Sequence, residues 1–582
     1  MAGIYGIFAD GIDREYPWYK YMFSSRFEQV ANCQTTHANK GITGRSSLTL
    51  YPQDRFETYH DSAYFMNEGI LLGYDRNELP ESFVRDYYKK PQTFFEQLAG
   101  SYCGCIVSEH ADSVALYNDF MGTRPLFYYF NKATKRFIFS SELKFFPPVF
   151  NALNIACEPN ERAWRELAVN GYLIGSHTLI SGVQKLPRNS LLRWNRPAGA
   201  VVLCSQGEDL PCDDIQHADA AFFDRVADRL EWTIRASREK DQSYGYRHLQ
   251  ALSGGLDSRV NAGIAHQLGY TTSRTLTFTQ SHTYEEQSAR AFAKYMGMNH
   301  EVTYLDGGAY LMEDLIATGL ASDGLVKIHG GAHQYHNMRK HYRQGEGMFH
   351  TGQIGDVVFG SFTLTGRPVY ERVRKQAFFR DDVLFDRYFQ NDERIERYAQ
   401  YGEKAFTRYA LEERMVNSAF NGDQVCYHFT DAISPFTDRQ LINLVLALPA
   451  ADLKGQQIYF QVLARRFPFL LNTRLDRSFF APANYRWYNA GNLLMRAWKK
   501  VNRREHMNPY DLWFSQNEML RKWFGETVTA LMHVYGSEPL IKELARASED
   551  SISGHLQPLT LLVAYDTHFG EQILWKSFKK DC

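Results

Sequence analysis

The stretch LSGGLDSRV at residues 252–260 decides the fold. It follows the strand-like run HLQA at 248–251 and precedes NAGIAHQLG at 261–269, whose apolar spacing is helical. The sequence continues as RTLTFT at 274–279, YEEQSARAFAKYMG at 284–297 and HEVTYL at 300–305. This alternation is typical of βαβ units, so we predict a parallel sheet with the loop at the carboxyl end of its first strand.

The residues of this loop suit a polyphosphate. Gly254 and Gly255 let the backbone turn tightly with its amide hydrogens facing outward. Ser253 and Ser258 add hydroxyl donors at the positive end of the next helix. The carboxylate of Asp257 would repel phosphate unless a bound Mg²⁺ bridges the two. A glycine-rich turn with a capping Ser or Asp is the structural alternative, but the order strand, loop, aspartate, helix favours a nucleotide site.

The length of the chain predicts two domains, and its composition gives a net charge close to zero. Its 582 residues are too many for one core. The 65 Lys and Arg almost balance the 66 Asp and Glu, so no global field favours nucleic acid or an anionic membrane. No signal-peptide pattern and no long apolar run occur, so we expect a cytoplasmic protein without a transmembrane segment. The eight cysteines lack metal or disulfide spacing, and we expect Cys103 and Cys105 to pack on one strand face.

The pattern of predicted strands and helices changes near residue 210. Up to that point short strands and turns predict a largely antiparallel α+β domain over residues 1–208. The polar segment SQGEDLPCDDIQHADA at 205–220 marks the boundary. We predict that residues 215–582 form an α/β domain whose part after about residue 365 is helical.

A second segment, MFHTGQIGDVVFGSF at 348–362, again combines a strand, a glycine loop and a lone carboxylate, Asp356. The SGGxDS pattern resembles the pyrophosphate-binding loop of the N-type ATP pyrophosphatases, which cleave ATP to AMP and pyrophosphate. The second segment is similar to the asparagine synthetase motif LSGEGSDEVFGG. This resemblance implies that the chain binds ATP and Mg²⁺, with Asp257 and Asp356 as the metal ligands. The implied nucleotide-binding residues are Leu252, Ser253, Gly254, Gly255, Asp257, Ser258 and Gly352, with Thr277, Phe278 and Thr279 beside adenine.

The resemblance to the asparagine synthetase and β-lactam synthetase superfamily extends over most of the chain. NDFMGTRPLFYYF at 118–130 is similar to the family's RDxxGxxPLYY, and FIFSSELKFF at 137–146 to its FASExKAL. SGVQKLPRNSLL at 181–192 and ISPFTDRQLINLVLALPAADLKG at 433–455 match two further family segments. The resemblance implies an N-terminal Ntn-hydrolase-like α+β sandwich, related to glutaminases, and a C-terminal parallel-sheet ATP-pyrophosphatase synthetase domain.

Departures from the family concern the nitrogen source. Glutamine-using members begin MCGIxG, whereas this chain begins MAGIYG, so Ala2 supplies no thiol and no thioester can form. The family's NGE is altered to Asn67, Glu68 and Gly69. We therefore predict that glutamine hydrolysis is lost and that ammonia or a substrate amine is the nucleophile. The β-lactam synthetases and the macrolactam cyclases of lasso peptides resemble the chain in this respect.

Further departures concern the catalytic side chains. Gln353 stands where asparagine synthetases carry Glu and β-lactam synthetases carry Tyr, and a neutral amide can hold an amine or a carbonyl oxygen but cannot take a proton. The family's phosphate-contacting lysine falls near Tyr459 or Phe460, so Lys454, Arg474 or Arg477 are the candidates to replace it. In ASDGLVKIHGGAHQYH at 321–336, Asp323 is the leading candidate for substrate contact. The other polar members are Lys327, His329, His333 and His336, for which structural, substrate-binding and metal roles stay open.

These features predict an ATP-dependent, AMP-forming amide ligase that activates a small-molecule or peptide carboxylate and transfers it to an amine or ammonia. The alternatives are a lasso-type macrolactam cyclase, an enzyme that amidates uronic acids of polysaccharides, and an inactive nucleotide-binding scaffold that recruits a biosynthetic partner protein. The basic stretch RAWKKVNRREH at 496–506 suggests either a solvated helix face or a surface for an acidic partner or a membrane.

Overall fold

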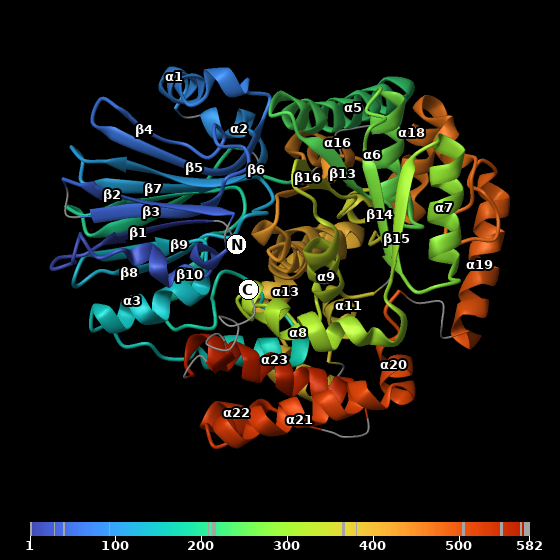
Figure 1. Cartoon of the computed structure of the whole chain (residues 1–582). Helices are drawn as coiled ribbons and strands as arrows, with labels where there is room; N and C mark the ends of the chain where they lie inside the picture. Colours follow the sequence, from blue (N-terminus) through green and yellow to red (C-terminus); the bar gives the residue numbers. More distant parts are fainter. Residues whose placement is uncertain are drawn as a thin grey trace.

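The computed structural model describes residues 3–27, 29–38, 41–91, 93–207, 209–211, 217–363, 367–379, 381–502, 507–547, 551–570 and 573–574. The first part of the chain forms two antiparallel six-stranded sheets, in the orders β10-β8-β9-β1-β3-β2 and β12-β11-β7-β6-β5-β4 (Figure 1). The strands of the first sheet are β1 Gly3–Phe8, β2 Val30–His37, β3 Gly41–Leu48, β8 Phe127–Asn131, β9 Arg136–Ser140 and β10 Val183–Lys185. Those of the second are β4 Glu57–His60, β5 Ala63–Leu72, β6 Ala99–Ser108, β7 Ser113–Asn118, β11 Ser190–Asn195 and β12 Ala200–Ser205.

Alternate side chains of these strands meet between the two sheets. Ile4 and Phe8 of β1 pack in one cluster with Leu116 of β7 and Trp194 of β11. Cys103 and Cys105 of β6 belong to the same cluster as buried free thiols, so the predicted packing role is confirmed. This sandwich arises because period-2 alternation places one face of each sheet inward.

The second part contains a five-stranded sheet in the order β15-β14-β13-β16-β17, with every neighbouring pair parallel. Its strands are β13 Arg247–Ala251, β14 Arg274–Thr279, β15 Asn299–Tyr304, β16 Glu346–His350 and β17 Ala432–Ile433. Helix α6 (Leu256–Gln267) connects β13 to β14, and α7 (Tyr284–Met296) connects β14 to β15. The predicted fold class, an antiparallel α+β sandwich followed by a parallel α/β sheet, is confirmed.

The order of the strands creates a crevice at one edge of this sheet. From β13 the chain first adds β14 and β15 on one side and later adds β16 on the other. The loops after β13 and β16 therefore leave the same edge in opposite directions, which is the switch point where open α/β sheets bind ligands.

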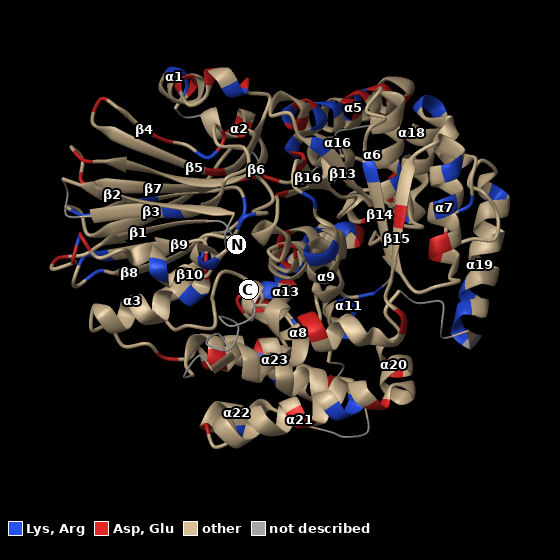
Figure 2. Ribbon diagram, in the orientation of Figure 1, with Lys and Arg blue, Asp and Glu red and all other residues tan. Residues whose placement is uncertain are grey.

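Helices surround this sheet and continue to the end of the described chain (Figure 1). The main ones are α5 Ala220–Ser243, α8 Ala309–Ala321, α9 Ala332–His341, α16 Arg439–Leu446, α18 Gln457–Arg466, α19 Tyr485–Val501, α20 Tyr510–Gln516, α21 Glu518–Tyr535 and α23 Ser553–His568, together with a π-helix at Ala410–Ala419. Charged side chains lie mostly on these helices and on loops, and few lie on strands (Figure 2). Of the helices described, none is long and apolar enough to span a bilayer.

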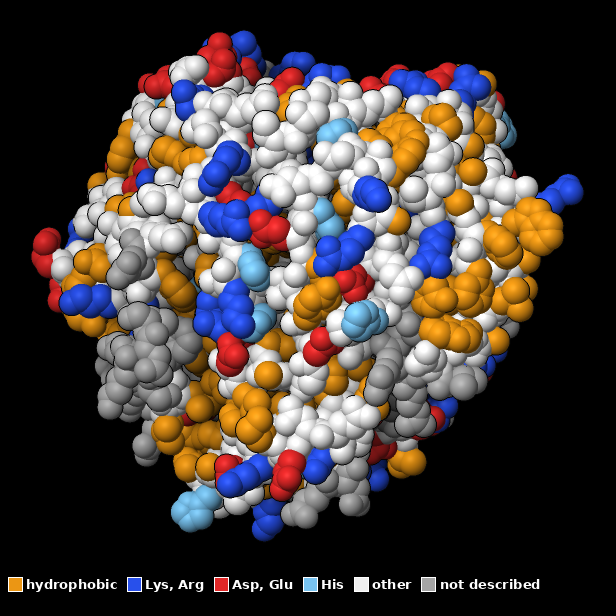
Figure 3. All heavy atoms as spheres, turned by 45° about the vertical axis from the view of Figure 1, so that its right-hand side comes forward, with side chains coloured by type: hydrophobic (Ala, Val, Ile, Leu, Met, Phe, Trp, Pro, Cys, Tyr) orange, Lys and Arg blue, Asp and Glu red, His pale blue; other side chains and the backbone are white. Residues whose placement is uncertain are grey.

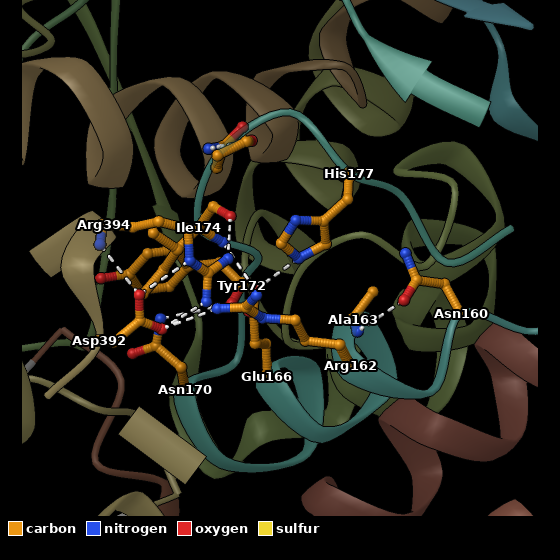
Figure 4. A network of polar contacts seen from close by, with 12 residues as sticks. Asn160, Arg162, Ala163, Glu166, Asn170, Tyr172, Ile174, His177, Asp392 and Arg394 are labelled. Carbon is orange, nitrogen blue, oxygen red and sulfur yellow. Dashed lines mark hydrogen bonds and ion pairs between the residues drawn. The ribbon is translucent and has the colours of Figure 1, made fainter. Parts of the chain in front are cut away.

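An ion-pair network joins the front sandwich to the C-terminal helices (Figure 4). Glu166 of α4 (Glu161–Asn170) accepts hydrogen bonds from Arg394 at 2.5 Å and from the backbone N–H of Ile174 at 2.9 Å. Arg394 also pairs with Asp392 at 2.6 Å, and Glu166 lies 2.9 Å from the ring of His177. Because Glu166 and Asp392 are almost completely buried, this network holds the two parts of the chain in a defined arrangement.

Candidate active site

The loop after β13 folds over the first turn of α6. The backbone nitrogen and the hydroxyl of Ser253 both lie 2.8 Å from the Ser258 hydroxyl, and the N–H of Gly255 donates to Ser253 at 3.2 Å. A Cβ on Gly254 would lie 2.7 Å from the Cβ of Asp476 and 2.8 Å from the Cα of Glu285, so this position requires glycine. The loop thus presents hydroxyl and amide donors at a helix N-terminus, the arrangement that suits phosphate oxygens.

The loop after β16 brings the second predicted aspartate against the first. The backbone N–H of Asp356 donates to Oδ2 of Asp257 at 2.9 Å. A Cβ on Gly352 would lie 2.3 Å from the backbone nitrogen of Ser258, and a Cβ on Gly355 would lie 2.7 Å from Cγ of Asp257. Two glycines therefore allow this close approach of the loops, and the predicted pairing of residues 99 positions apart is seen in the structure.

Asp257 has the properties of a cation ligand. Burial and the neighbouring charge of Asp356 raise the pKa of Asp257 to about 7. The Tyr459 hydroxyl interacts with this buried carboxyl group and lowers its pKa in part, as does the backbone N–H of Asp356. Asp356 is partly exposed and accepts from the Ser361 hydroxyl at 3.2 Å. This pair of hard oxygen ligands fits Mg²⁺.

Of the three basic candidates, Arg477 is the one whose pKa responds to the charges of the two aspartates. Desolvation lowers the pKa of Arg477, but three carboxylates, Asp257 and Asp356 among them, outweigh this effect and raise it. Lys454 is exposed in the turn at 454–456. Arg474 donates to Gln287 at 2.7 Å and covers the ring of Tyr284. The structure therefore favours Arg477 over Lys454 and Arg474 as the phosphate contact.

Tyr459 also faces the aspartate pair. Its ring stacks on Phe359 with centroids 4.0 Å apart, and its buried hydroxyl interacts with the carboxyl group of Asp257. Burial and the charges of Asp257 and Asp356 raise the pKa of Tyr459 well above its usual value. The hydroxyl thus stays protonated at neutral pH and is a fixed neutral donor beside the pair.

The end of β14 lies next to the first loop. The hydroxyl of Thr277 donates to the carbonyl of Leu252, and that of Thr279 donates to Glu285 at 3.1 Å. Burial and Asp476 raise the pKa of Glu285 to about 7. Phe278 is only partly buried. The adenine contact of residues 277–279 stays a prediction, now with Glu285 as a neighbouring buried acid.

Gln353 contacts a buried carboxyl group that sequence reasoning missed. Its Nε2 donates to Oδ1 of Asp423 at 2.6 Å, and its backbone carbonyl accepts from Ser434 at 2.8 Å. Burial raises the pKa of Asp423 to about 7, while hydrogen bonds from Gln334 and Gln353 lower it. Asp423 follows a π-helix and carries no motif signal in the sequence, so only the tertiary contact with Gln353 identifies it.

Asp323 does not lie at this site. Its carboxylate is fully buried and accepts from the backbone N–H groups of Leu143 at 3.0 Å and Lys144 at 3.2 Å, and from the Lys144 ammonium at 2.7 Å. His568 contacts its backbone carbonyl at 2.8 Å. The predicted substrate contact is wrong, because Asp323 instead neutralises a buried lysine between the front sandwich and α23.

The histidine-rich segment divides in two. His336 pairs with Asp314 at 2.5 Å and belongs with Glu313 to one of two described groups that could hold a metal ion. The other group is Asp241, His248 and His350. His329 and His333 belong to neither of these groups. They lie partly exposed at the start of α9.

A buried ion cluster occupies the boundary between the front sandwich and the synthetase sheet. Arg55 pairs with Glu68 at 2.9 Å and with Asp431 at 2.6 Å, and Arg124 pairs with the same two acids. All four side chains are 2% exposed or less. Beside the cluster, a cavity of about 10 Å³ separates Ser101 and Thr123 from Gln353, space for at most one water molecule. Ala2 lies outside the described residues.

Comparison with known families agrees with this geometry. A family model described as a glutamine amidotransferase domain matches residues 79–201, and one described as asparagine synthase matches residues 225–458. The chain belongs to the asparagine synthetase-like superfamily. The asparagine synthase match supports an ATP-dependent amide ligase. Both aspartates of the site, together with Gln353 and Asp423, lie within the matched range.

Other comparisons add little to this family assignment. No curated protein matches the chain. A solved structure titled "Structure of the allosteric regulatory enzyme of purine biosynthesis" is 8% identical, covers 52% of this chain and 80% of its own, and has a TM-score of 0.25. In this chain Tyr459 lies near the position at which a family lysine was expected, and Gln353 pairs with Asp423.

Proposed function

We propose that this chain is an AMP-forming amide ligase that adenylates a substrate carboxylate and passes it to an amine or ammonia without hydrolysing glutamine. The observation that supports this most directly is the pair Asp257 and Asp356, in which the backbone N–H of Asp356 donates to Asp257 and the charge of Asp356 raises the pKa of the buried Asp257 carboxyl group. Two neighbouring carboxyl groups repel each other, and a bound cation offsets this repulsion.

In the first step, a carboxylate oxygen of the substrate attacks the α-phosphorus of ATP, the bond to the bridging oxygen breaks, and pyrophosphate leaves. Ser253, Ser258 and the loop amides hold the pyrophosphate oxygens, and Arg477 and Tyr459 donate to them. Mg²⁺ held by Asp257 and Asp356 would neutralise part of the charge on pyrophosphate. Most of the rate enhancement then comes from positioning and electrostatics.

In the second step, the amine nitrogen attacks the acyl carbon, the acyl–oxygen bond breaks, and AMP leaves. The amine must lose a proton, which Gln353 cannot accept. The carboxyl group of Asp423 accepts a hydrogen bond from Gln353, and a pKa of about 7 suits a general base at neutral pH. Gln353 positions the amine or the carbonyl oxygen, and Asp423 takes the proton.

A buried ion cluster in the front sandwich supports the proposed loss of glutamine hydrolysis. The cluster of Arg55, Glu68, Arg124 and Asp431 joins the altered NEG segment directly to the synthetase part. Its charges already satisfy one another, so they offer little to a glutamine molecule. We therefore propose that the sandwich is structural and that the nitrogen arrives with the substrate or from solution.

Exchange of labelled pyrophosphate into ATP tests the proposal. A panel of carboxylic acids, including acidic peptides and uronic acids, should contain one that induces exchange in the presence of Mg²⁺. Asp257→Ala should abolish that exchange while circular dichroism stays unchanged. If no acid induces exchange although ATP binds, the chain is the nucleotide-binding scaffold. If Asp257→Ala exchanges normally, the metal role is refuted.

A further inference from the structure

Helix α19 (Tyr485–Val501) packs against the synthetase part through one of its faces. It lies at the rim of the molecule, on the side away from the front sandwich (Figure 1). Tyr488 and Met495 point inward and are buried. A Cβ on Gly491 would lie 2.4 Å from the Ser478 hydroxyl, which donates to the backbone carbonyl of Tyr488 at 2.8 Å. The inward face therefore fixes the helix to the protein, and the opposite face points to solvent.

The outward face of α19 exposes large apolar side chains. Trp487 is 60% exposed, Leu493 69% and Leu494 59%. The ring of Phe480 is 42% exposed and lies 5.6 Å from that of Trp487, so the apolar surface extends beyond the helix. We call this surface the outer stripe, and its members are Phe480, Trp487, Ala490, Leu493, Leu494 and Ala497. On an ideal helix the members from α19 fall within an arc of about 120°. Contiguous exposed apolar surface marks an interaction site.

The space-filling view agrees with this description. Figure 3 shows hydrophobic side chains gathered on the right of the face that it draws, on the side of the molecule where α19 lies. Because α19 is at the rim of the molecule in Figure 1, a flat surface can contact it there.

Basic side chains border the outer stripe. The sequence of α19, YRWYNAGNLLMRAWKKV, contains two arginines, two lysines and no acidic residue, and the helix carries blue segments in Figure 2. Arg486, Arg496 and Lys500 are exposed. Within the described part of the chain no carboxylate pairs with these three, whereas Lys499 lies 3.9 Å from Asp476. The outward face is therefore positively charged, although the whole chain has a net charge of -1.

Charge complementarity favours a bilayer over a second copy of the chain. Helices that lie in the headgroup region of a bilayer carry Trp and Leu on one face and Lys or Arg beside it, as α19 does. The long stems of Arg and Lys cover apolar surface while their charged ends contact lipid phosphates. A symmetric contact between two copies would instead place the basic side chains of one α19 against those of the other, and α19 offers no acidic partner.

We propose that the outward face of α19 binds an anionic lipid bilayer. The outer stripe lies at the boundary between headgroups and acyl chains, and Arg486, Arg496 and Lys500 contact lipid phosphates. Beneath the helix, the backbone N–H of Asp476 donates to the carbonyl of Gly254 in the loop after β13 at 3.0 Å. One short segment thus joins this surface to the candidate active site, so binding brings that site close to the bilayer. The inference does not depend on the proposed ligase activity.

Co-sedimentation of the full chain with lipid vesicles tests this inference. Phosphatidylglycerol mixed with phosphatidylcholine provides the anionic surface, and phosphatidylcholine alone provides the neutral one. We expect about hundredfold tighter binding to the anionic vesicles at low salt, because each of three basic side chains near such a surface contributes about fivefold. Added NaCl should remove most of this difference. Equal binding to both vesicles overturns the proposal. So does binding to neither, and binding of polyglutamate in that case indicates an acidic protein partner instead.

Variants locate the binding to α19. Trp487→Gln should weaken binding to anionic vesicles about tenfold and Arg496→Gln about fivefold, with unchanged unfolding temperatures because both side chains are exposed. The matched controls are Val383→Gln, which is 71% exposed on α12 (Asp382–Phe389), and Lys522→Gln, whose side chain is 73% exposed on α21. Unchanged vesicle binding in both α19 variants refutes the site. A lipid-free dimer that Trp487→Gln dissociates, without vesicle binding, would make the surface a contact between copies and the proposal wrong.

Discussion

Replacement of Asp257 by Asn should stabilise the protein at alkaline pH when no divalent cation is present. Burial and Asp356 raise the pKa of Asp257 from 3.8 to about 7, so its charge is disfavoured in the folded state. The unfolded chain loses this proton near pH 4 and the folded chain keeps it until about pH 7. Stability is therefore lost as the pH rises from about 4 to about 7, by roughly 4 kcal/mol in total.

The amide of Asn removes this cost because it does not ionise. At pH 8 with EDTA we expect Asp257→Asn to unfold at a higher temperature than the natural chain by several degrees, and at pH 4 the two should unfold together. Added MgCl₂ should raise the unfolding temperature of the natural chain at pH 8 and leave that of the variant unchanged. Differential scanning calorimetry across pH 4–8 measures both effects.

The control for this experiment is Asp61→Asn, because Asp61 is 81% exposed and Asn tolerates its positive φ of 51°. This control should follow the natural chain at every pH. An Asp257→Asn variant that is less stable than the natural chain at pH 8 in EDTA would refute the argument. It would mean that the ionised carboxylate stabilises the fold through contacts other than a cation.

Three further substitutions test the remaining parts of the site. Tyr459→Phe should slow pyrophosphate exchange about tenfold with little effect on stability, since it removes one donor from a buried site; an unchanged rate would show that the hydroxyl does not reach phosphate. Asp423→Asn should leave exchange intact but reduce amide formation by 10²-fold or more and remove the pH dependence near 7, measured by product release; loss of exchange as well would contradict its role as a base. Asp431→Asn should lower the free energy of unfolding by about 3 kcal/mol, because it removes a negative charge that pairs with the buried guanidinium groups of Arg55 and Arg124. An unchanged denaturation midpoint would show that the cluster does not stabilise the fold.

The two glycine loops of the candidate site were predictable because their information is local. Gly254 and Gly255 lie between a strand and a helix and predict a tight turn of the backbone there. Asp257 beside them predicts a polar site at the start of the helix. The same holds for Gly352 and Asp356, and the structure brings the two aspartates together as predicted. Hydrophobic periodicity likewise sufficed for the parallel sheet, since alternating strands and helices have few ways to pack.

Predictions that depended on distant partners fared less well. Asp323 looked like a substrate ligand in sequence, but the fold places it against Lys144, which is 179 residues away. The replacement of the family lysine could not be chosen from sequence, because Arg477 and Tyr459 reach the aspartates only through the path of the chain after β17. Asp423 lacks any motif and is recognised only by its contact with Gln353.

The sequence by itself thus determined the fold class, the two glycine loops that carry the paired aspartates and the absence of a cysteine at position 2. Only the tertiary structure decided which carboxyl and basic groups share a site, because a pKa and a ligand set depend on distance and burial rather than on sequence neighbours.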